Sequence, residues 1–216
     1  MSIRGGVIER TIFRDNHSSR SGNAAAGGGA IHFEGTLLLR NCLFYDNSAR
    51  HGGGIGLTTV SSGHQLTVEN CTITRNHSHN SHDWWSAGGI WNRSVNADLR
   101  IYNSIIIGNT GGPNINFPGT AYELLHSCIS PKTIHLDGEA GFDADGNITD
   151  APLFEDTDAD DFRLSRESPC INAGTPRDWH DGAVDLDGKR RVDAIYNQVD
   201  MGAYEYQYPA TIILIR

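Results

Sequence analysis

The stretch QLTVENCTITRN, residues Gln65–Asn76, decides the fold. Leu66 and Val68 alternate with polar neighbours, which is the period of a half-buried strand. Asn70 interrupts this alternation, and Asn tolerates a left-handed backbone better than most residues. The apolar alternation then resumes at Cys71. The stretch therefore predicts a strand, a bend at Asn70 and a second strand.

Similar stretches recur along the chain at intervals of about 30 residues. LLLRNCLFYDN at residues 37–47 and LRIYNSIIIGN at residues 99–109 are close copies, and residues 11–16 and 124–129 are weaker ones. A second motif, Gly-Gly followed by Ile, lies between the copies. A repeat of this length with two strand signals per unit predicts a stacked, solenoid architecture.

A parallel β-helix fits this repeat best. No apolar stripe has the 3.6-residue period that helical repeats need, and the period is too short for a propeller blade of about 40 residues. In a parallel β-helix, equivalent residues of successive coils lie over one another. The predicted interior columns are Leu37, Leu66 and Leu99, and Phe44, Ile73 and Ile106. The bend residues Asn41, Asn70 and Asn103 are predicted to form an amide ladder along the stack.

We therefore expect an all-β, right-handed parallel β-helix of about four to five coils, because parallel crossovers are strongly right-handed. Residues 1–150 are expected to form the coils, and residues 151–216 a C-terminal cap of the same domain. Cys42, Cys71 and Cys128 are predicted to share one column, in which Ser104 fills the gap. Either a file of buried thiols or a disulfide between Cys42 and Cys71 is compatible with that column.

The composition limits the classes of partner that the chain can have. The 216 residues include 17 Lys and Arg against 26 Asp and Glu, and the net charge of −9 argues against nucleic acid as a partner. No run approaches the ~20 apolar residues of a membrane span. The first residues lack the apolar segment of a signal peptide and already belong to the repeat, so we expect a fragment of a longer protein or a first coil that a partner covers. An open first coil, or the β-prone stretch Ile212–Ile215, could support self-association.

The insertion between Asn76 and Gly88 has the most unusual composition in the chain. Trp84 and Trp85, with Trp91 nearby, could offer flat faces on which sugar rings stack. A structural alternative is that the Trp rings fold back to cover the coil surface. Imidazoles suit divalent transition metals, so the three histidines of this loop are a second candidate site. They are His77, His79 and His82.

Two further sets of residues are candidates for acid/base catalysis and for metal binding. If the chain is an enzyme, the candidate acid/base residues are His79, His82, Asp83 and Arg75. Asp143, Asp145 and Asn147 follow one another at every second position and could offer oxygen ligands to Ca²⁺, although the EF-hand spacing is incomplete. A solvated acidic turn explains the same pattern.

The last sixty residues carry a resemblance. The segments APLF (151–154), DFRL (161–164), SPCINAG (168–174), DLDGKRR (185–191) and DMGAYE (200–205) occur in this order. Together with the Gly-Gly-Ile repeats, the chain resembles bacterial extracellular parallel β-helix proteins, such as the chlamydial polymorphic outer-membrane proteins. This resemblance implies a pectate-lyase-like solenoid and a secreted or cell-surface location among carbohydrates. It does not imply one reaction, because the same fold serves many functions.

Three functions follow as expectations. The first is a non-catalytic, adhesive or glycan-contacting module on the cell surface or outside the cell. The second is a polysaccharide lyase or glycoside hydrolase acting on an extracellular polysaccharide. The third is a structural spacer or oligomerisation piece.

Overall fold

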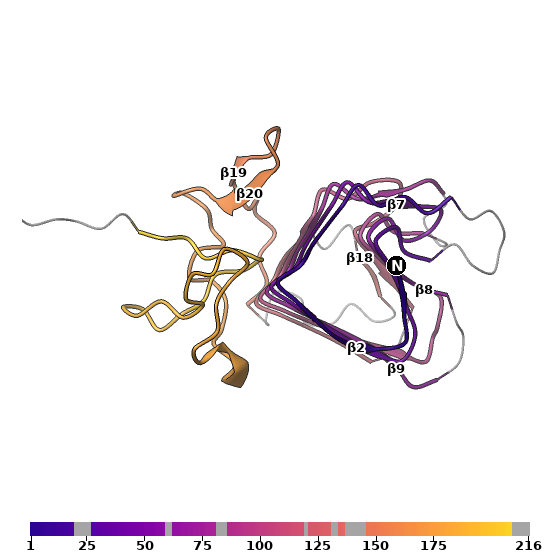
Figure 1. Cartoon of the computed structure of the whole chain (residues 1–216), viewed down its shortest axis with the longest axis horizontal. Helices are drawn as coiled ribbons and strands as arrows, with labels where there is room; N and C mark the ends of the chain where they lie inside the picture. The colour runs from indigo at the N-terminus through magenta and orange to yellow at the C-terminus, as the bar shows by residue number, and fades with distance from the viewer. Residues whose placement is uncertain are drawn as a thin grey trace, which may run out of the picture.

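Three parallel sheets run along a stack of coils. The structure, a computed structural model, describes residues 1–19, 27–58, 62–80, 86–118, 121–130, 134–136 and 146–208. Figure 1 looks along the stack and shows its three-sided outline.

In hydrogen-bonding order, sheet A contains β1 (Ser2–Ile3), β4 (Ile31–Phe33), β8 (Ile55–Leu57), β12 (Ile90–Asn92), β15 (Ile115–Phe117) and β18 (Ile134–Leu136). Sheet B contains β2 (Gly6–Glu9), β5 (Thr36–Arg40), β9 (His64–Glu69), β13 (Ala97–Tyr102) and β16 (Ala121–Leu125). Sheet C contains β3 (Ile12–Arg14), β6 (Leu43–Tyr45), β10 (Thr72–Thr74), β14 (Ile105–Ile107) and β17 (Cys128–Ile129). The short strands β7 (Ser48–Ala49) and β11 (His77–Ser78) pair after sheet C.

The predicted bends lie where sheet B meets sheet C. Asn41, Asn70 and Asn103 have φ values of 50°, 48° and 49°, so each adopts the left-handed conformation. Arg10 and His126 take the same conformation in the first and last coils. We call Asn41, Asn70 and Asn103 the vertex asparagines.

The predicted apolar columns are confirmed. Leu37 pairs in register with Leu66, and Leu66 with Leu99, and all three are fully buried. Phe44, Ile73 and Ile106 form the second column, which Phe13 extends into the first coil at 4.6 Å between stacked ring centroids. Each fully buried side chain of this kind stabilises the fold by ~1.5–3 kcal/mol, so the columns supply the core.

The amide ladder involves a different set of asparagines from the predicted one. Asn47 donates from Nδ2 to Asn76 Oδ1 at 2.8 Å, and Asn76 donates to Asn109 Oδ1 at 2.9 Å. Asn16 and Asn114 extend the ladder at its two ends. The prediction for the vertex asparagines was wrong, because their side chains point out of the stack; the one bond between them is 3.5 Å long.

The cysteine column also differs from the prediction. Cys42 donates its backbone N–H to Cys71 Sγ, Cys71 to Ser104 Oγ, and Ser104 to Ser127 Oγ. Cys128 is therefore not a member of this column; it pairs with Ile105 on the outer side of sheet C. All four cysteines are buried free thiols, so the predicted alternative of a Cys42–Cys71 disulfide is not formed.

The Gly-Gly motif marks a close approach of successive coils. A Cβ atom on Gly53 would lie 2.2 Å from the carbonyl oxygen of Gly88, and one on Gly29 would lie 2.2 Å from that of Gly53. Any side chain at these positions would push the coils apart, which explains why glycine recurs there.

Residues 151–208, which we call the C-terminal region, lie along the vertex between sheets B and C (Figure 1). The region therefore covers the flank of several coils and does not close the end of the stack. Its regular structure is limited to an antiparallel hairpin of β19 (Phe154–Asp156) and β20 (Asp161–Leu164), and the 3₁₀ helix η4 (Asp178–His180).

The vertex asparagines hold this region. Asn41 donates to Val184 O, Asn70 to Asp200 O, and Asn103 to Thr175 O, at 2.9–3.0 Å. Outward apolar residues of sheet C pack against it in two clusters, one around Leu43, Tyr45 and Phe162 and one around Ile105, Cys128 and Cys170.

A buried ionic network completes the attachment. Arg191 is fully buried and donates to Asn41 Oδ1, Glu205 Oε1 and Gly202 O at 2.9, 2.5 and 2.7 Å. The carboxylate of Asp185 accepts the backbone N–H of Lys189 and of Glu205. These residues belong to the two C-terminal segments that carry the family resemblance, DLDGKRR and DMGAYE. Their role in this structure is to dock the region on the coils.

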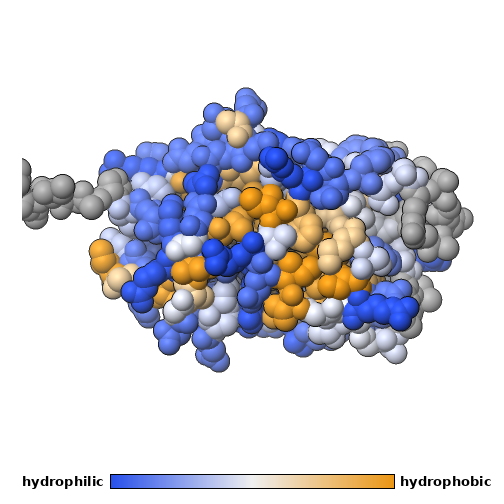
Figure 2. Space-filling model, in the orientation of Figure 1, coloured by the Kyte–Doolittle hydropathy of each residue, from blue (hydrophilic) through white to orange (hydrophobic). Residues whose placement is uncertain are grey.

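The first coil presents an apolar surface. Among the described residues, β1, β2 and β3 each pair with a strand on one side only. Met1, Val7 and Ile12 are 49–64% exposed, and Figure 2 shows the apolar patch on this face of the molecule. Among the described residues, no helix has the length and apolar character needed to span a membrane.

Candidate functional site

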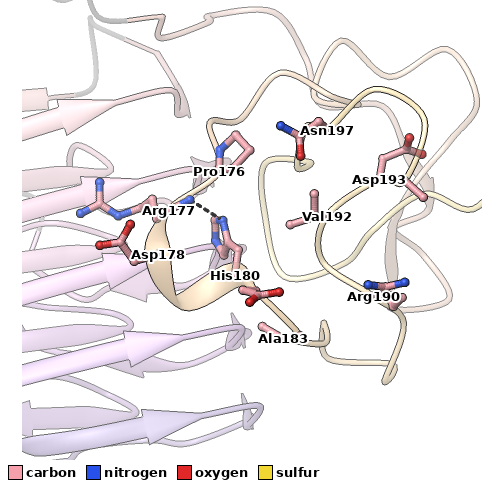
Figure 3. A pocket seen from close by; sticks show the side chains of 12 residues that line it. Pro176, Arg177, Asp178, His180, Ala183, Arg190, Val192, Asp193 and Asn197 are labelled. Atoms are coloured by element: carbon pink, nitrogen blue, oxygen red, sulfur yellow. Dashed lines mark hydrogen bonds between the residues drawn. The ribbon is translucent and has the colours of Figure 1, made fainter.

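The described surface is hollowed on both sides of η4. A cavity of about 510 Å³ lies within the C-terminal region, and one of about 460 Å³ lies between that region and sheet B. Pro176, Arg177 and Asp178 line both, and we call the two neighbouring depressions together the η4 groove. Figure 3 shows the first part, with Val192, Asp193 and Asn197 on the wall opposite η4. The other residues of the groove are Arg40, Glu69, Trp179, His180, Asp181, Gly182, Ala183, Arg190 and Ala194.

The coils position η4 through the vertex asparagines. Asn103 accepts the backbone N–H of Thr175 at 2.9 Å and donates to its carbonyl oxygen, which fixes the chain just before η4. Asn70 Oδ1 lies 2.9 Å from Nε2 of His180 at the end of η4. The groove therefore rests on two successive coils and has a rigid floor.

His180 is a buried residue that holds η4 in position beside the groove. Its Nδ1 accepts the backbone N–H of Arg177 at 2.9 Å (Figure 3), so the proton of the neutral ring is on Nε2, which donates to Asn70. Burial, and the positive charges of Arg191 and Arg177, lower the pKa of His180 to about 3. The ring is therefore neutral at physiological pH and positions η4 without carrying a charge.

Aromatic rings and guanidinium groups alternate where η4 meets sheet B. The Arg40 guanidinium lies 4.7 Å from the Trp179 ring centroid, and that of Arg177 lies 3.7 Å from the Tyr102 ring centroid. Glu69 receives hydrogen bonds from both guanidinium groups, at 2.6 and 3.1 Å. Trp179 Nε1 is buried and has no hydrogen-bond partner in the part of the chain that the structure describes.

The outer walls carry polar groups that face solvent. Asp178, Asp181, Arg190 and Asn197 are exposed, while Asp193 is held by backbone N–H groups of Ile195 and Tyr196. Such a mixture of carboxylates, amides, guanidinium groups and a half-buried indole can bind a ligand that is rich in hydroxyl groups. In the described ranges, no group of three or more His, Cys, Asp or Glu residues has an arrangement suited to a metal ion.

The residues predicted as catalytic are not brought to this groove. Arg75 forms ion pairs with Asp46 and Asp160, and its guanidinium lies 5.0 Å from the Phe162 ring centroid. It therefore ties the β19–β20 hairpin to sheet C, which differs from the predicted acid/base role. His79 lies edge-on to His17 and His77, at 5.4 and 4.9 Å between ring centroids. Partial burial and these two rings lower its pKa.

The predicted ligand residues have different positions as well. Trp91 is 4% exposed and stacks on His51 at 4.7 Å, so its ring offers no face to a sugar, contrary to the prediction. Asn147 is buried, accepts the N–H of Ser127 and donates to Leu124 O. Its amide oxygen therefore continues the Cys42–Ser127 column, which corrects its prediction as a calcium ligand. The other predicted site residues lie outside the described residues: His82, Asp83, Trp84, Trp85, Asp143 and Asp145.

Sequence reasoning missed the residues of the η4 groove. One signal was present: the segment PRDWHDG, residues 176–182, combines Trp, His and Asp as the His77–Trp85 insertion does. Arg40, Glu69 and Tyr102 could not be assigned to it, because they lie on three different coils and meet η4 only after the C-terminal region docks.

Comparison with known proteins supports the fold alone. A protein-family model described as a right handed beta helix region matches residues 1–129, which is more than half of the chain. Neither the curated proteins nor the solved structures that were searched gave a match.

Proposed function

Since the chain belongs to the right-handed β-helix family, we propose that it is a non-catalytic, secreted or surface-exposed module that contacts a glycan through the η4 groove. The observation that carries this proposal is the groove itself. It combines a half-buried indole, backed by a guanidinium group, with exposed carboxylates and an amide on a rigid floor.

The chemistry of the lining supports a carbohydrate. Sugars present hydroxyl groups that donate and accept hydrogen bonds, and apolar C–H faces that pack on aromatic rings. Asp178, Asp181 and Asn197 supply polar partners, and Trp179 supplies an apolar face.

Glycan-array screening followed by calorimetry tests the proposal. Trp179→Ala, and the milder pair Asp178→Asn with Asn197→Ala, should each weaken binding about tenfold or more, which corresponds to ~1.4 kcal/mol. Asp158→Asn, in the turn between β19 and β20, is the control and should leave the affinity unchanged.

Two results would count against the groove. One is the absence of binding across neutral and acidic glycans. The other is binding that survives the groove variants but is lost in Trp84→Ala with Trp85→Ala, which would assign the contact to the His77–Trp85 insertion.

A second candidate is a polysaccharide lyase or glycoside hydrolase, and one observation favours it. His79 lies against the rings of His17 and His77, and burial and these rings lower its pKa, which favours the neutral imidazole that can accept a proton. Incubation with alginate, pectin and glycosaminoglycans should then yield unsaturated products or new reducing ends. His79→Asn should abolish that activity, whereas no product from any substrate would leave the binding module as the better account.

A further inference from the structure

Two thiols pack in one buried cluster where the C-terminal region meets the last coils. Cys128 belongs to β17 and points away from the interior of the stack, in the outward column that contains Ile105. Cys170 belongs to the C-terminal region and packs in the same cluster, with Leu164 and Met201. Both cysteines are fully buried.

The side chains of Cys128 and Cys170 pack in one buried cluster, and the interaction with Cys128 raises the pKa of Cys170. Cys128 Sγ also lies 3.2 Å from the carbonyl oxygen of Asp150. Ser168 Oγ accepts the backbone N–H of Cys170 at 3.2 Å, which fixes the start of the turn that carries this cysteine. Each of the two cysteines is therefore held in place by its own hydrogen bond.

We propose that Cys128 and Cys170 form a disulfide when the chain folds in an oxidising compartment, and that this bond staples the C-terminal region to the coils. The two thiols lose two protons and two electrons, and one S–S bond forms between them. Glutathione disulfide, or a protein disulfide of the same class, accepts the two electrons through a mixed disulfide and is released as two thiols. The inference does not depend on glycan binding.

The protonation state of the thiols in the folded chain determines when the disulfide can form. Contact with Cys128, together with burial, raises the pKa of the Cys170 thiol far above its ordinary value. The thiolate is the reactive species, so the docked Cys170 thiol reacts slowly. The bond should form during folding, or in molecules whose C-terminal region is transiently detached.

Cys42 and Cys71 provide an internal comparison. They are also neighbours, but they lie in adjacent coils of one stack, where Cys71 Sγ accepts the backbone N–H of Cys42 at 3.4 Å. Their side chains follow the stacking direction, and a bridge between them would have to leave it and give up this hydrogen bond. A disulfide between Cys42 and Cys71 would join two coils that the strand ladders already join. A disulfide between Cys128 and Cys170 would join the coils to the C-terminal region.

Oxidative refolding tests the proposal with the full-length chain. Protein refolded in reduced and oxidised glutathione is blocked with an alkylating reagent, digested and mapped by mass spectrometry. We expect a linked pair of peptides containing Cys128 and Cys170, with Cys42 and Cys71 alkylated. The melting temperature should rise by about 5–10 °C over the reduced protein, because the bond closes a long loop.

Variants separate the staple from general effects of oxidation. Cys170→Ser should remove the rise in melting temperature, and Cys42→Ser should retain it. The mapping of the unmodified chain needs no variant, so it remains decisive if a variant fails to fold. The proposal is overturned if Cys128 and Cys170 are both alkylated in oxidatively refolded, native chain, or if the linked peptides contain Cys42 and Cys71 alone.

Discussion

The coils and the C-terminal region are stabilised in different ways. The coils repeat one set of contacts: strand ladders, apolar columns and the amide ladder from Asn16 to Asn114. The C-terminal region contains one hairpin and one short helix, and depends on single interactions with the vertex asparagines and on the buried charge of Arg191. A repeated structure distributes its stability over many equivalent contacts, whereas an irregular one concentrates it in a few residues.

This difference has a functional consequence. The η4 groove has its floor on the coils and its walls on the C-terminal region. Its shape therefore depends on the few interactions that dock one region on the other. Substitutions that break the docking should change the groove while the columns of the coils persist.

The largest effect should come from Arg191→Ala. The substitution removes a fully buried cation and leaves the Glu205 carboxylate without its cationic partner and Asn41 Oδ1 without the Arg191 donor, which should destabilise the docked state by ~3–5 kcal/mol. Thermal unfolding followed by Trp fluorescence measures the effect. Arg190→Ala, at the exposed neighbouring position, is the matched control and should change stability by less than ~0.5 kcal/mol. Equal stability of the two variants would show that the buried network does not hold the region.

Asn76→Ala should have the next largest effect, and in the coils. Asn76 donates to Asn109 and accepts from Asn47 inside the stack, so its loss leaves buried amides unsatisfied at a cost of ~1–3 kcal/mol. Urea unfolding followed by circular dichroism at the β-sheet band measures it. Asn70→Ala is the comparison, because it breaks the bonds to Asp200 and His180 and should weaken the docking first. If Asn76→Ala released the C-terminal region while the coils kept their stability, the division between the regions would be wrong.

The coils and the C-terminal region also differ in how much of each could be predicted from the sequence. Period-2 alternation and the repeat gave the columns of Leu66 and Ile73, because burial in a stack selects apolar residues at equivalent positions. The asparagines equivalent to Asn70 and those equivalent to Asn76 recur with the same spacing in successive coils. Spacing alone therefore could not tell which of the two columns points inward and forms the hydrogen-bonded ladder. The contacts of Arg191 with Asn41 and Asn70, and of Trp179 with Arg40, could not be predicted either, because they join residues more than 100 positions apart.

A smaller effect should appear as a pH dependence. The pKa of His180 is lowered to about 3 in the folded chain, whereas an unfolded histidine titrates near 6.5. Between these values the unfolded state binds more protons, so the contribution of His180 to stability is present above pH ~6.5 and is lost as the pH falls toward 3.

His180→Gln should remove this acid-dependent loss. The stability difference between the two proteins, measured by urea unfolding at several pH values, should shrink as the pH falls. Taking the difference cancels other groups, including Asp200, whose pKa burial raises to about 6. A difference that stays constant from pH 7 to pH 4 would show that the pKa of His180 is not lowered in the folded chain.

The smallest effect is expected at Arg75. Its ion pairs with Asp46 and Asp160 are partly exposed, so screening limits their contribution, and Arg75→Ala should cost no more than ~1 kcal/mol. The melting temperature in low and high salt measures it, and the two proteins should converge in high salt. A loss as large as that of Arg191→Ala would show that the hairpin is a principal attachment.

Hydrogen exchange of the unmodified chain and of Arg191→Ala tests the division between the two regions most directly. The account predicts that amides of β5, β9 and β13 keep their protection in the variant, while amides between residues 170 and 205 exchange faster by a factor of about 100 or more. Loss of protection in the coils by the same factor would contradict it, because both regions would then unfold as one unit.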